Sequence, residues 1–327
     1  MEKPVANSLS IGIIGGGAAG MSCALWLKQL GYTPLIIERG NQLGGQLLDI
    51  DRLNRWVLGL PSLSSIELAQ VYADHIKQES ITIFYQTQLL VIEKLGLGYQ
   101  LNIKKSDNTC LSLPVIAIVI ATGIRPIGAE MFAQLDGFPA VLNKGLISFF
   151  PLDHIAWLTT LQNKTVAVVG GGDNAHYTAK DIALANAHTH LLVRSLARAQ
   201  KLIRKEIEEL IAQSKIIEHS HSQINRFKLN HDKIEVTLSH TDATTVQIEV
   251  DRIFVRTGFT PNIEFLDNFE VFSGIAKQSV YLQVDAAQRT SIPWVYAIGD
   301  VVGHNPRSVV NAIASGAIAA QDISERI

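Results

Sequence analysis

The sequence predicts an α/β protein made of two doubly wound domains, with the second inserted into the first. Two glycine-rich motifs support this prediction, GGGAAG at residues 15–20 and GGGDNA at residues 170–175. Each motif comes directly after an apolar run and directly before a stretch with helical periodicity, which is the strand–turn–helix context of a Rossmann-like, dinucleotide-binding fold. The length of 327 residues also suits about two domains.

The first motif follows the apolar run at residues 11–14. In that context Gly15 permits a tight turn, Gly17 lets the backbone approach a pyrophosphate, and Gly20 lets the helix pack on the strand. The N–H groups at the helix N-terminus, together with the helix dipole, then face the phosphates. The motif therefore predicts a dinucleotide site, and a glycine-rich turn in another kind of α/β protein is the alternative.

The second predicted strand, PLIIE, ends at Glu38. Its carboxylate stands about 20 residues after the glycines, where an acid can accept hydrogen bonds from a ribose. The glycine-bearing loop that follows, residues 39–47, is too polar and too broken to continue a strand or a helix. We expect this loop at the carboxyl end of the sheet, where ligands bind in doubly wound folds.

Composition and charge exclude some classes of function. The chain has 28 Lys and Arg residues against 30 Asp and Glu residues, so nothing favours a nucleic acid or an anionic membrane as partner. Residues 1–10 are polar and contain no apolar core of a signal peptide, and no apolar run approaches the ~18 residues of a membrane span. We expect a soluble, cytoplasmic protein.

After the first motif, the pattern alternates between helix and strand. A helical pattern at residues 66–78 is followed by strand-like segments, and the apolar run LPVIAIVIATG at 113–123 is typical of a buried strand. This alternation predicts an antiparallel insertion attached to the parallel sheet. The run ends in Ala121, Thr122 and Gly123, small residues that let a ligand approach the backbone, although a simple strand-to-turn exit also explains them.

Residues 124–162 are irregular and rich in proline and glycine, so we place a domain crossing there. The predicted domains are residues 1–125 with 255–327, and the inserted residues 126–254. After the inserted domain, residues 258–262 predict a turn. A final buried strand at 294–298 ends at Gly299 and Asp300, before a helix that begins at about Ser308. We expect Asp300 to face the same crevice as the first glycine loop.

The second glycine motif has the same strand–turn–helix context as the first. A strand is predicted at 165–169, a helix follows the glycines through residue 187, and the next strand leads to Arg194. Two such units in one chain indicate two dinucleotides. Arg194 takes the place that Glu38 has in the first unit, with Arg198 close behind. A guanidinium there can pair bidentately with a 2′-phosphate and so favours NADP over NAD, and a solvated arginine is the alternative.

Neither cysteines nor histidines predict a metal site. Cys23 and Cys110 are far apart and belong to no CxxC motif, so we interpret them as core or surface thiols. Four histidines lie on the strands predicted after the helix at 201–213: His219, His221, His231 and His240. A metal is conceivable because two of them share a strand face, but no cysteine or carboxylate stands at ligand spacing, so the sequence favours solvated histidines.

Six motifs together resemble the low-molecular-weight thioredoxin reductase family, flavoproteins with two dinucleotide-binding domains. They are GGGAAG with Glu38, LGGQL at 43–47, ATGIRP at 121–126, GGGDNA at 170–175, TGFTPN at 257–262 and AIGDVVG at 297–303. The resemblance covers nearly the whole chain. It implies an FAD domain made of both chain ends, an inserted NAD(P)H domain and a homodimer.

Carried over residue by residue, the resemblance assigns two sets of contacts. The FAD set is Gly15, Gly17, Ala18, Ala19, Gly20, Glu38, Arg39, Gly45, Gln46, Asn54, Leu89, Ala121, Thr122, Gly123, Gly299, Asp300, Val301, Arg307, Ser308 and Val309. The NADP set is Gly170, Gly172, Asp173, Asn174, Ala175, Arg194, Ser195 and Arg198. The resemblance implies that Gly45 and Gln46 lie by the flavin, that Leu89 lies by the adenine, and that Asp300 bonds the ribityl chain. Val301 and the helix start at 307–309 would meet the N1/O2 edge of the isoalloxazine ring.

Two departures from the family pattern bear on the chemistry. The redox CxxC of the family lies shortly before the second glycine motif, where residues 145–170 of this chain contain no cysteine, so no dithiol relay is expected. The family's arginine pair, HRR followed by a further arginine, reads Val193, Arg194 and Ser195 here, with Arg198. One phosphate ligand is therefore missing. We assign no catalytic residue, because the flavin itself is the redox group.

The sequence favours an FAD-dependent oxidoreductase that passes electrons from NADPH, or NADH, to an unidentified acceptor, either a ferredoxin- or flavodoxin-like protein or a small molecule. Cysteine-free ferredoxin/flavodoxin–NADP reductases of this fold have a stretch similar to residues 143–150. They usually carry a C-terminal extension that covers the flavin, whereas the present sequence stops at Ile327, shortly after its last predicted helix. One alternative is a relative with a degenerate nicotinamide site and another electron donor. The other is a flavin-binding protein without enzyme activity.

Overall fold

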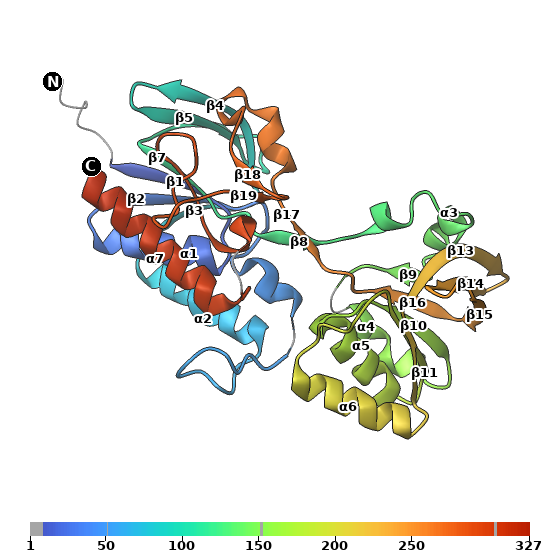
Figure 1. The fold of residues 1–327 in the computed structure, drawn as a ribbon. Helices are drawn as coiled ribbons and strands as arrows, with labels where there is room; N and C mark the ends of the chain where they lie inside the picture. The colour runs from blue at the N-terminus through green and yellow to red at the C-terminus, as the bar shows by residue number, and fades with distance from the viewer. Residues whose placement is uncertain (1–8, 51, 151–152, 304–305) are drawn as a thin grey trace. The chain divides into compact units, whose positions relative to one another are not determined.

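The computed structural model describes residues 9–50, 52–150, 153–303 and 306–327; most of the polar stretch in which we expect no signal peptide lies outside this part of the chain. The chain divides into two compact units. The first runs up to Arg125 and resumes at Thr260, and the second is Pro126–Phe259. Each unit is an α/β domain around a five-stranded parallel sheet (Figure 1).

The parallel sheet of the first unit has the strand order β20-β7-β1-β2-β3. Its strands are β1 (Ser10–Ile14), β2 (Thr33–Ile37), β3 (Thr82–Phe84), β7 (Ala117–Ile120) and β20 (Val295–Ala297). The apolar run before the first glycine motif is β1, as predicted, and all of its residues are buried. A strand covered on both faces needs apolar side chains in every position, which explains the unbroken run.

Helices lie on one face of this sheet and antiparallel strands on the other (Figure 1), and an apolar cluster packs against each face. Ile11 and Ile13 belong to the cluster formed with three helices, α1 (Ala18–Gln29), α2 (Ser65–Gln78) and α7 (Val309–Arg326). Ile118 and Ile120 belong to the cluster formed with an antiparallel sheet of β4 (Gln88–Leu95), β5 (Gly98–Lys104) and β6 (Cys110–Val115). The structure thus confirms the antiparallel insertion and the helix expected at 66–78.

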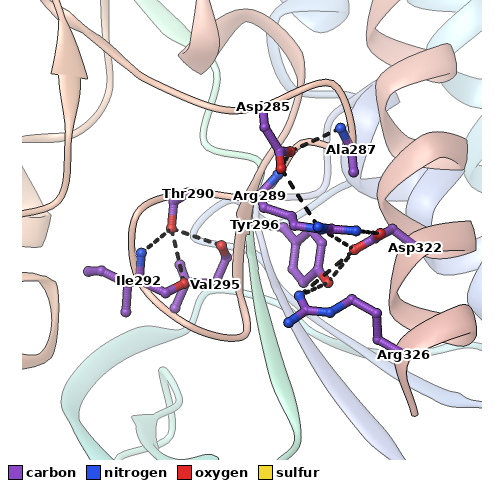
Figure 2. Close-up of polar contacts among 9 residues, drawn as sticks. All are labelled: Asp285, Ala287, Arg289, Thr290, Ile292, Val295, Tyr296, Asp322 and Arg326. Carbon is purple, nitrogen blue, oxygen red and sulfur yellow. Dashed lines mark hydrogen bonds and ion pairs between the residues drawn. The ribbon is translucent and has the colours of Figure 1, made fainter.

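A polar network joins α7 to β20, the edge strand of the parallel sheet (Figure 2). Asp322 of α7 accepts hydrogen bonds from Arg289 Nε at 2.8 Å and from the Tyr296 hydroxyl at 2.7 Å. Its other carboxylate oxygen pairs with Arg289 Nη2. Arg326 donates to the Tyr296 hydroxyl at 3.2 Å. Because Asp322 is only 7% exposed and Tyr296 is fully buried, the last helix depends on this network as well as on its apolar packing.

The second unit repeats the plan of the first. Its parallel sheet has the order β12-β11-β10-β16-β9 and consists of β9 (Ile147–Ser148), β10 (Thr165–Val169), β11 (His188–Val193), β12 (Ile216–Ser220) and β16 (Arg252–Val255). Helices α5 (Asp173–Leu184) and α6 (Lys201–Ala212) pack on one face. The other face is covered by an antiparallel sheet of β13 (Ser222–Asn230), β14 (Lys233–His240) and β15 (Thr245–Val250).

Some predicted boundaries differ from the structure. The run at 113–123 is two strands, because the chain leaves the antiparallel sheet after Val115 and enters the parallel sheet at Ala117. Residues 124–162 are more regular than expected, with β8 (Ile124–Pro126), α3 (Phe138–Asn143), β9 and α4 (Asp153–Trp157). Aromatic packing explains part of this order, since Phe138 lies against Phe132 and Phe227 at centroid distances of 5.7 and 5.8 Å.

The return to the first unit also comes later than expected. The second unit ends at Phe259 and not at residue 254, because β16 pairs with both β10 and β9 and so belongs to the inner part of the second sheet. The expected turn at 258–262 contains a short strand, β17 (Phe259–Pro261), which pairs with β8. No helix in the described ranges is both long enough and apolar enough to cross a membrane.

The remaining elements are short. In the first unit they are a hairpin of β18 (Lys277–Gln278) and β19 (Tyr281–Leu282), and the 3₁₀ helices η1 (Gly45–Asp49), η4 (Glu264–Asn268), η5 (Glu270–Phe272) and η6 (Gly299–Val302). In the second unit they are the 3₁₀ helices η2 (Ala129–Met131) and η3 (Leu158–Thr160). Two of them, η1 and η6, begin at glycines of the candidate site, Gly45 and Gly299.

Candidate dinucleotide-binding sites

The first glycine turn joins β1 to α1, and two of its glycines are required by the protein itself. Gly15 has φ of +110°, donates its N–H to Ile37 O at 2.9 Å, and leaves no room for a side chain, since a Cβ there would lie 2.5 Å from Ala121 O. A Cβ on Gly20 would lie 2.0 Å from Gly15 O. These positions therefore serve the tight turn and the close packing of helix on strand.

Gly17 is different, because nothing in the described protein requires a glycine there. Its φ of −74° suits any residue, and the nearest atom to an added Cβ is Gly45 Cα at 4.0 Å. No described side chain caps the helix that starts after it, in contrast to α2 and α7, where Ser64 and Ser308 accept from backbone N–H groups. Open space in front of an uncapped helix N-terminus fits the approach of a phosphate group.

Glu38 lies beside this turn at the end of β2. Its carboxylate is buried and accepts the Gly16 N–H at 2.7 Å through Oε2 and the Gly40 N–H at 2.6 Å through Oε1. Each carboxylate oxygen has a second lone pair, so two further hydrogen bonds can be accepted from ribose hydroxyls. Arg39, next in the chain, is exposed. The geometry fits the ribose role that the sequence predicts for Glu38.

The loop after Glu38 returns to the same turn. Gly44 donates its N–H to Gly16 O at 2.9 Å, and a Cβ on Gly45 would lie 3.1 Å from Gly17 Cα. Both glycines have positive φ, +131° and +54°, and Gln46 follows in η1. The structure thus brings Gly45 and Gln46 next to the helix N-terminus, where the sequence expects a cofactor. Asn54 lies farther along, in the loop between η1 and α2, and Leu89 lies in β4.

The carboxyl end of β7 forms a second wall. Ala121 donates its N–H to Ile14 O at 2.8 Å, which places it beside the first turn. Thr122 Oγ1 donates to Asn262 O at 2.8 Å, and Asn262 Nδ2 donates to Thr122 O at 2.9 Å. The backbone of Gly123 also accepts from the Asn262 N–H at 2.9 Å. Asn262 therefore holds the predicted residues in place, although the sequence analysis does not assign it to the site.

The chain comes back to the turn once more at η6. Gly299 has φ of +74° and donates its N–H to Ser315 Oγ at 2.9 Å, and a Cβ on it would lie 2.9 Å from the Ala19 Cβ. Asp300 and the buried Val301 follow within η6. Ser308 caps α7, which begins at Val309, and Arg307 pairs with the Tyr281 hydroxyl and lies over its ring. In the loop before α7, residues 304 and 305 are outside the described ranges.

The second glycine turn shows the same division of roles. Gly170 has φ of +145°, donates its N–H to Leu192 O at 2.9 Å, and would place a Cβ 2.3 Å from Arg256 O. Gly172 has φ of −102°, and no described atom lies within 4 Å of an added Cβ. No described side chain caps α5 after it. As at Gly17, the protein leaves open space before a helix N-terminus, which fits a second phosphate-bearing ligand.

The segment after β11, residues 194–200, lies beside this second turn. Arg194, Ser195 and Arg198 are all exposed, and Arg198 donates its backbone N–H to Gly171 O at 2.6 Å. The carboxylate of Asp173, predicted as a nucleotide contact, accepts two hydrogen bonds from Gln200. The sequence did not predict this contact, because 27 residues separate the partners. Asn174 and Ala175 follow in the first turn of α5.

The cysteines and histidines lie outside both glycine turns. Cys23 is buried in α1, where burial strongly raises the pKa of its thiol, and Cys110 is exposed at the start of β6. Of the histidines singled out, His219 and His240 approach each other at a centroid distance of 6.5 Å. His190, which the sequence analysis did not single out, stacks on His219 with Nδ1 and Nε2 2.9 Å apart.

This histidine cluster does not form a metal site in the described part of the chain, where no group of three or more ligand-type side chains converges. Burial, with the neighbouring His219 and His188, lowers the pKa of His190 to about 4. His190 therefore stays neutral at physiological pH. His221 and His231 lie in turns with φ of +53° and +57°.

Comparisons with known proteins agree with this architecture. A family model described as "Pyridine nucleotide-disulphide oxidoreductase" matches residues 9–316. Thioredoxin reductase of Buchnera aphidicola (subspecies Acyrthosiphon pisum) is 27% identical over 325 residues, 96% of this chain and 95% of that protein. Glucosaminate ammonia-lyase of Pseudomonas fluorescens is also 27% identical, over 95% of this chain and 93% of that protein. The crystal structure of Lactococcus lactis thioredoxin reductase matches with a TM-score of 0.81 and 24% identity, over 97% of this chain and 98% of that one, and shares the fold.

Proposed function

The chain belongs to the pyridine nucleotide-disulphide oxidoreductase family, and from that premise we propose that it carries electrons from NADPH through FAD to an external acceptor. The observation that supports the proposal is common to Gly17 and Gly172. At both positions the backbone angles and the neighbouring atoms would accept a side chain, yet the residue is glycine and a helix N-terminus opens onto the space. Two phosphate-binding turns of this kind suit two dinucleotides.

We assign FAD to the first turn, because four further segments meet there. Glu38 offers lone pairs to a ribose, and Gly45 with Gln46, Ala121 and Gly299 border the same helix N-terminus. When bound, FAD accepts electrons in pairs and releases them one at a time. The N-terminus of α7, capped by Ser308, carries the positive end of the helix dipole, which would stabilise negative charge on a flavin ring held beside it.

We assign the nicotinamide dinucleotide to the second turn. Arg194 stands at the end of β11, in the position that Glu38 has at the end of β2. A guanidinium favours a 2′-phosphate, so NADPH is the preferred donor and NADH the weaker one. Ser195 contributes only a neutral hydrogen bond, so the expected preference is about ten- to a hundredfold, the range that one charged hydrogen bond of about 1.5–3 kcal/mol supports.

The acceptor lies outside the chain. With Cys23 buried in α1 and Cys110 on β6, the second unit offers no dithiol that could relay electrons from a bound flavin. We propose a ferredoxin- or flavodoxin-like protein or a small molecule as the acceptor, and a homodimer in solution. A nucleic acid or a membrane is not part of the proposal, in keeping with the balanced charge of the chain.

One observation favours a second candidate function, a flavoprotein reduced by a donor other than a nicotinamide. Asp173 begins α5 directly after the open Gly172, and its negative charge opposes a pyrophosphate at that helix N-terminus. Anaerobic titration of the FAD-loaded protein separates the two candidates. Bleaching of the flavin absorbance by NADPH, and more weakly by NADH, supports the first. No bleaching by either nucleotide, in protein that dithionite reduces fully, favours the second.

A further inference from the structure

The segment that carries both arginines has no regular secondary structure of its own. Residues 194–200 connect β11 to α6, and three hydrogen bonds attach them to the second glycine turn. Arg198 N donates to Gly171 O at 2.6 Å, Gln200 N donates to Asp173 Oδ1 at 2.7 Å, and Gln200 Nε2 donates to Asp173 Oδ2 at 2.8 Å. Two of the three bonds depend on one carboxylate.

The carboxylate of Asp173 fixes Gln200 in two ways at once. One oxygen binds its backbone and the other binds its side chain, which sets both the path of the chain and the rotamer of Gln200. Both bonds are charge-assisted, a class that is short and about twice as strong as neutral hydrogen bonds. Gln200 is also the residue before the first turn of α6, so the bond pair joins the starts of α5 and α6.

An acid at this position acts against phosphate binding. The N–H groups and the dipole of α5 favour a phosphate in front of Gly172, and a carboxylate one residue away repels it. An uncharged residue would serve the phosphate better. What the aspartate supplies here is a pair of charge-assisted bonds to Gln200, one from each carboxylate oxygen.

We propose that Asp173 and Gln200 are positioning residues, which close the segment 194–199 over Gly171 and thereby set the preference for NADPH over NADH. This inference rests on the proposed function. Two long, exposed arginines on an irregular segment lose conformational freedom when they bind a phosphate, and a segment that is already fixed pays less of that cost on binding. NADH has no 2′-phosphate and does not need the segment. Loss of the bond pair therefore weakens NADPH selectively.

The charge of Asp173 itself affects both nucleotides equally, because both carry the same pyrophosphate. The ratio of their affinities therefore reports on the segment, whereas the absolute affinities also report on the charge. We use dissociation constants of NADP⁺ and NAD⁺, measured by titration calorimetry on FAD-loaded protein, because these need no turnover. The melting temperature of each variant reports separately on the fold.

Gln200→Glu places a second carboxylate against Asp173 and should open the segment. We expect the dissociation constant of NADP⁺ to rise about tenfold more than that of NAD⁺, or about 1.4 kcal/mol. Asp173→Asn should keep the ratio, because its Oδ1 still accepts from Gln200 N and the Gln200 amide can turn to accept from Asn Nδ2. In the double variant Asp173→Asn with Gln200→Glu, the amide donates to the new carboxylate, and the ratio should recover.

A matched control is Asp242→Ala, in the exposed turn between β14 and β15, where the carboxylate accepts from Thr244. It should leave both dissociation constants unchanged. Equal weakening of NADP⁺ and NAD⁺ in Gln200→Glu, or no recovery in the double variant, would overturn the positioning role. A wild-type protein that binds neither nucleotide would instead overturn the nicotinamide part of the proposed function, and the inference with it.

Discussion

The two glycine turns of this chain have nearly the same backbone and different surroundings. Gly15 and Gly170 are both held at positive φ with a carbonyl where a Cβ would stand, and Gly17 and Gly172 both face open space. At the first turn, however, a buried acid binds the backbone of the turn, and segments from three later parts of the chain close in. At the second turn, the neighbouring segment is exposed and attached mainly through Gln200.

The difference teaches that the backbone sets where a phosphate can bind, and the side chains at the end of the next strand set which ribose is accepted. Glu38 offers acceptors for hydroxyl groups, and Arg194 offers a charge for a phosphate. A turn bordered by several segments of the chain suits a cofactor that stays bound. A site with an exposed rim suits a substrate that must leave after each turnover.

The largest expected effect comes from closing the space at the first turn. Gly17→Val fits the backbone, since φ is −74°, but places a branched side chain where the phosphates of FAD must approach. We expect FAD affinity to fall by roughly a hundredfold or more, because overpacking a close contact costs several kcal/mol. Flavin content after gel filtration measures it. Retention of FAD at the wild-type ratio would show that this turn does not hold the cofactor.

The next variant tests how much the polar network around Asp322 stabilises the first unit. Asp322→Ala removes the acceptor shared by Arg289 and the buried Tyr296 hydroxyl, and leaves them only their described contacts with Asp285 and Arg326. We expect the free energy of unfolding to fall by about 1–3 kcal/mol, because Arg289 is partly exposed and its share of the pair is screened by solvent. Urea denaturation measures this, and Asp267→Ala, an exposed partner of Lys277 in the same unit, is the control that should cost almost nothing.

The same network predicts a pH dependence. Hydrogen bonds from Arg289, ahead of those from Tyr296, hold the pKa of Asp322 below its ordinary value. A carboxylate with a lowered pKa in the folded state stabilises fully above its unfolded pKa of about 3.9, and that contribution is lost as the pH falls through the lower folded pKa. The wild type should therefore lose stability below about pH 4 more steeply than Asp322→Ala. Parallel curves for the two proteins would contradict this.

The arginine segment carries a smaller effect that is confined to one nucleotide. Arg194→Ala should raise the KM for NADPH by roughly ten- to a hundredfold and leave that for NADH nearly unchanged, since only a charged hydrogen bond to the 2′-phosphate is lost. Lys205→Ala, an exposed change on α6, is the matched control. If both nucleotides weaken equally, Arg194 supports the fold and does not read the phosphate.

The smallest effect is expected from the thiols. Replacing both Cys23 and Cys110 by serine should change electron transfer from flavin to acceptor by less than about threefold, because no dithiol takes part. The buried hydroxyl at position 23 should cost about 1 kcal/mol of stability. Loss of turnover with FAD still bound would show that a thiol is involved after all.

Local patterns predicted much of this structure, and contacts between distant residues account for what they missed. The strand at 165–169 and the helix at 66–78 have clear apolar patterns, and the spacing of the glycines identifies the two turns. By contrast, the break at Ile116 divides one apolar run between two sheets. Tertiary packing determines this break, and the local sequence does not show it. Residues 138–143 read as irregular because their helix depends on aromatic contacts with Phe132 and Phe227.

In the candidate site too, local motifs could be predicted and contacts between distant residues could not. Gly15, Gly17 and Glu38 could be predicted because the chemistry of the site fixes their spacing. Asn262 bonds to Thr122 across 140 positions, and nothing in TGFTPN indicates that contact. The pairing of Asp173 with Gln200 is hidden for another reason, since an acid at the start of a helix is already explained by the dipole. Glutamine at an N-cap position is the weak signal that could have shown it.

The most direct test of the two-site account is the number of nucleotides bound by Gly172→Val. The wild type should retain one FAD and bind one NADP⁺ per chain in equilibrium dialysis. Gly172→Val fits the backbone at φ of −102° and fills only the space before α5, so it should retain its FAD and bind no NADP⁺. Loss of FAD from this variant, or NADP⁺ binding equal to that of the wild type, would contradict the assignment of separate dinucleotides to the two turns.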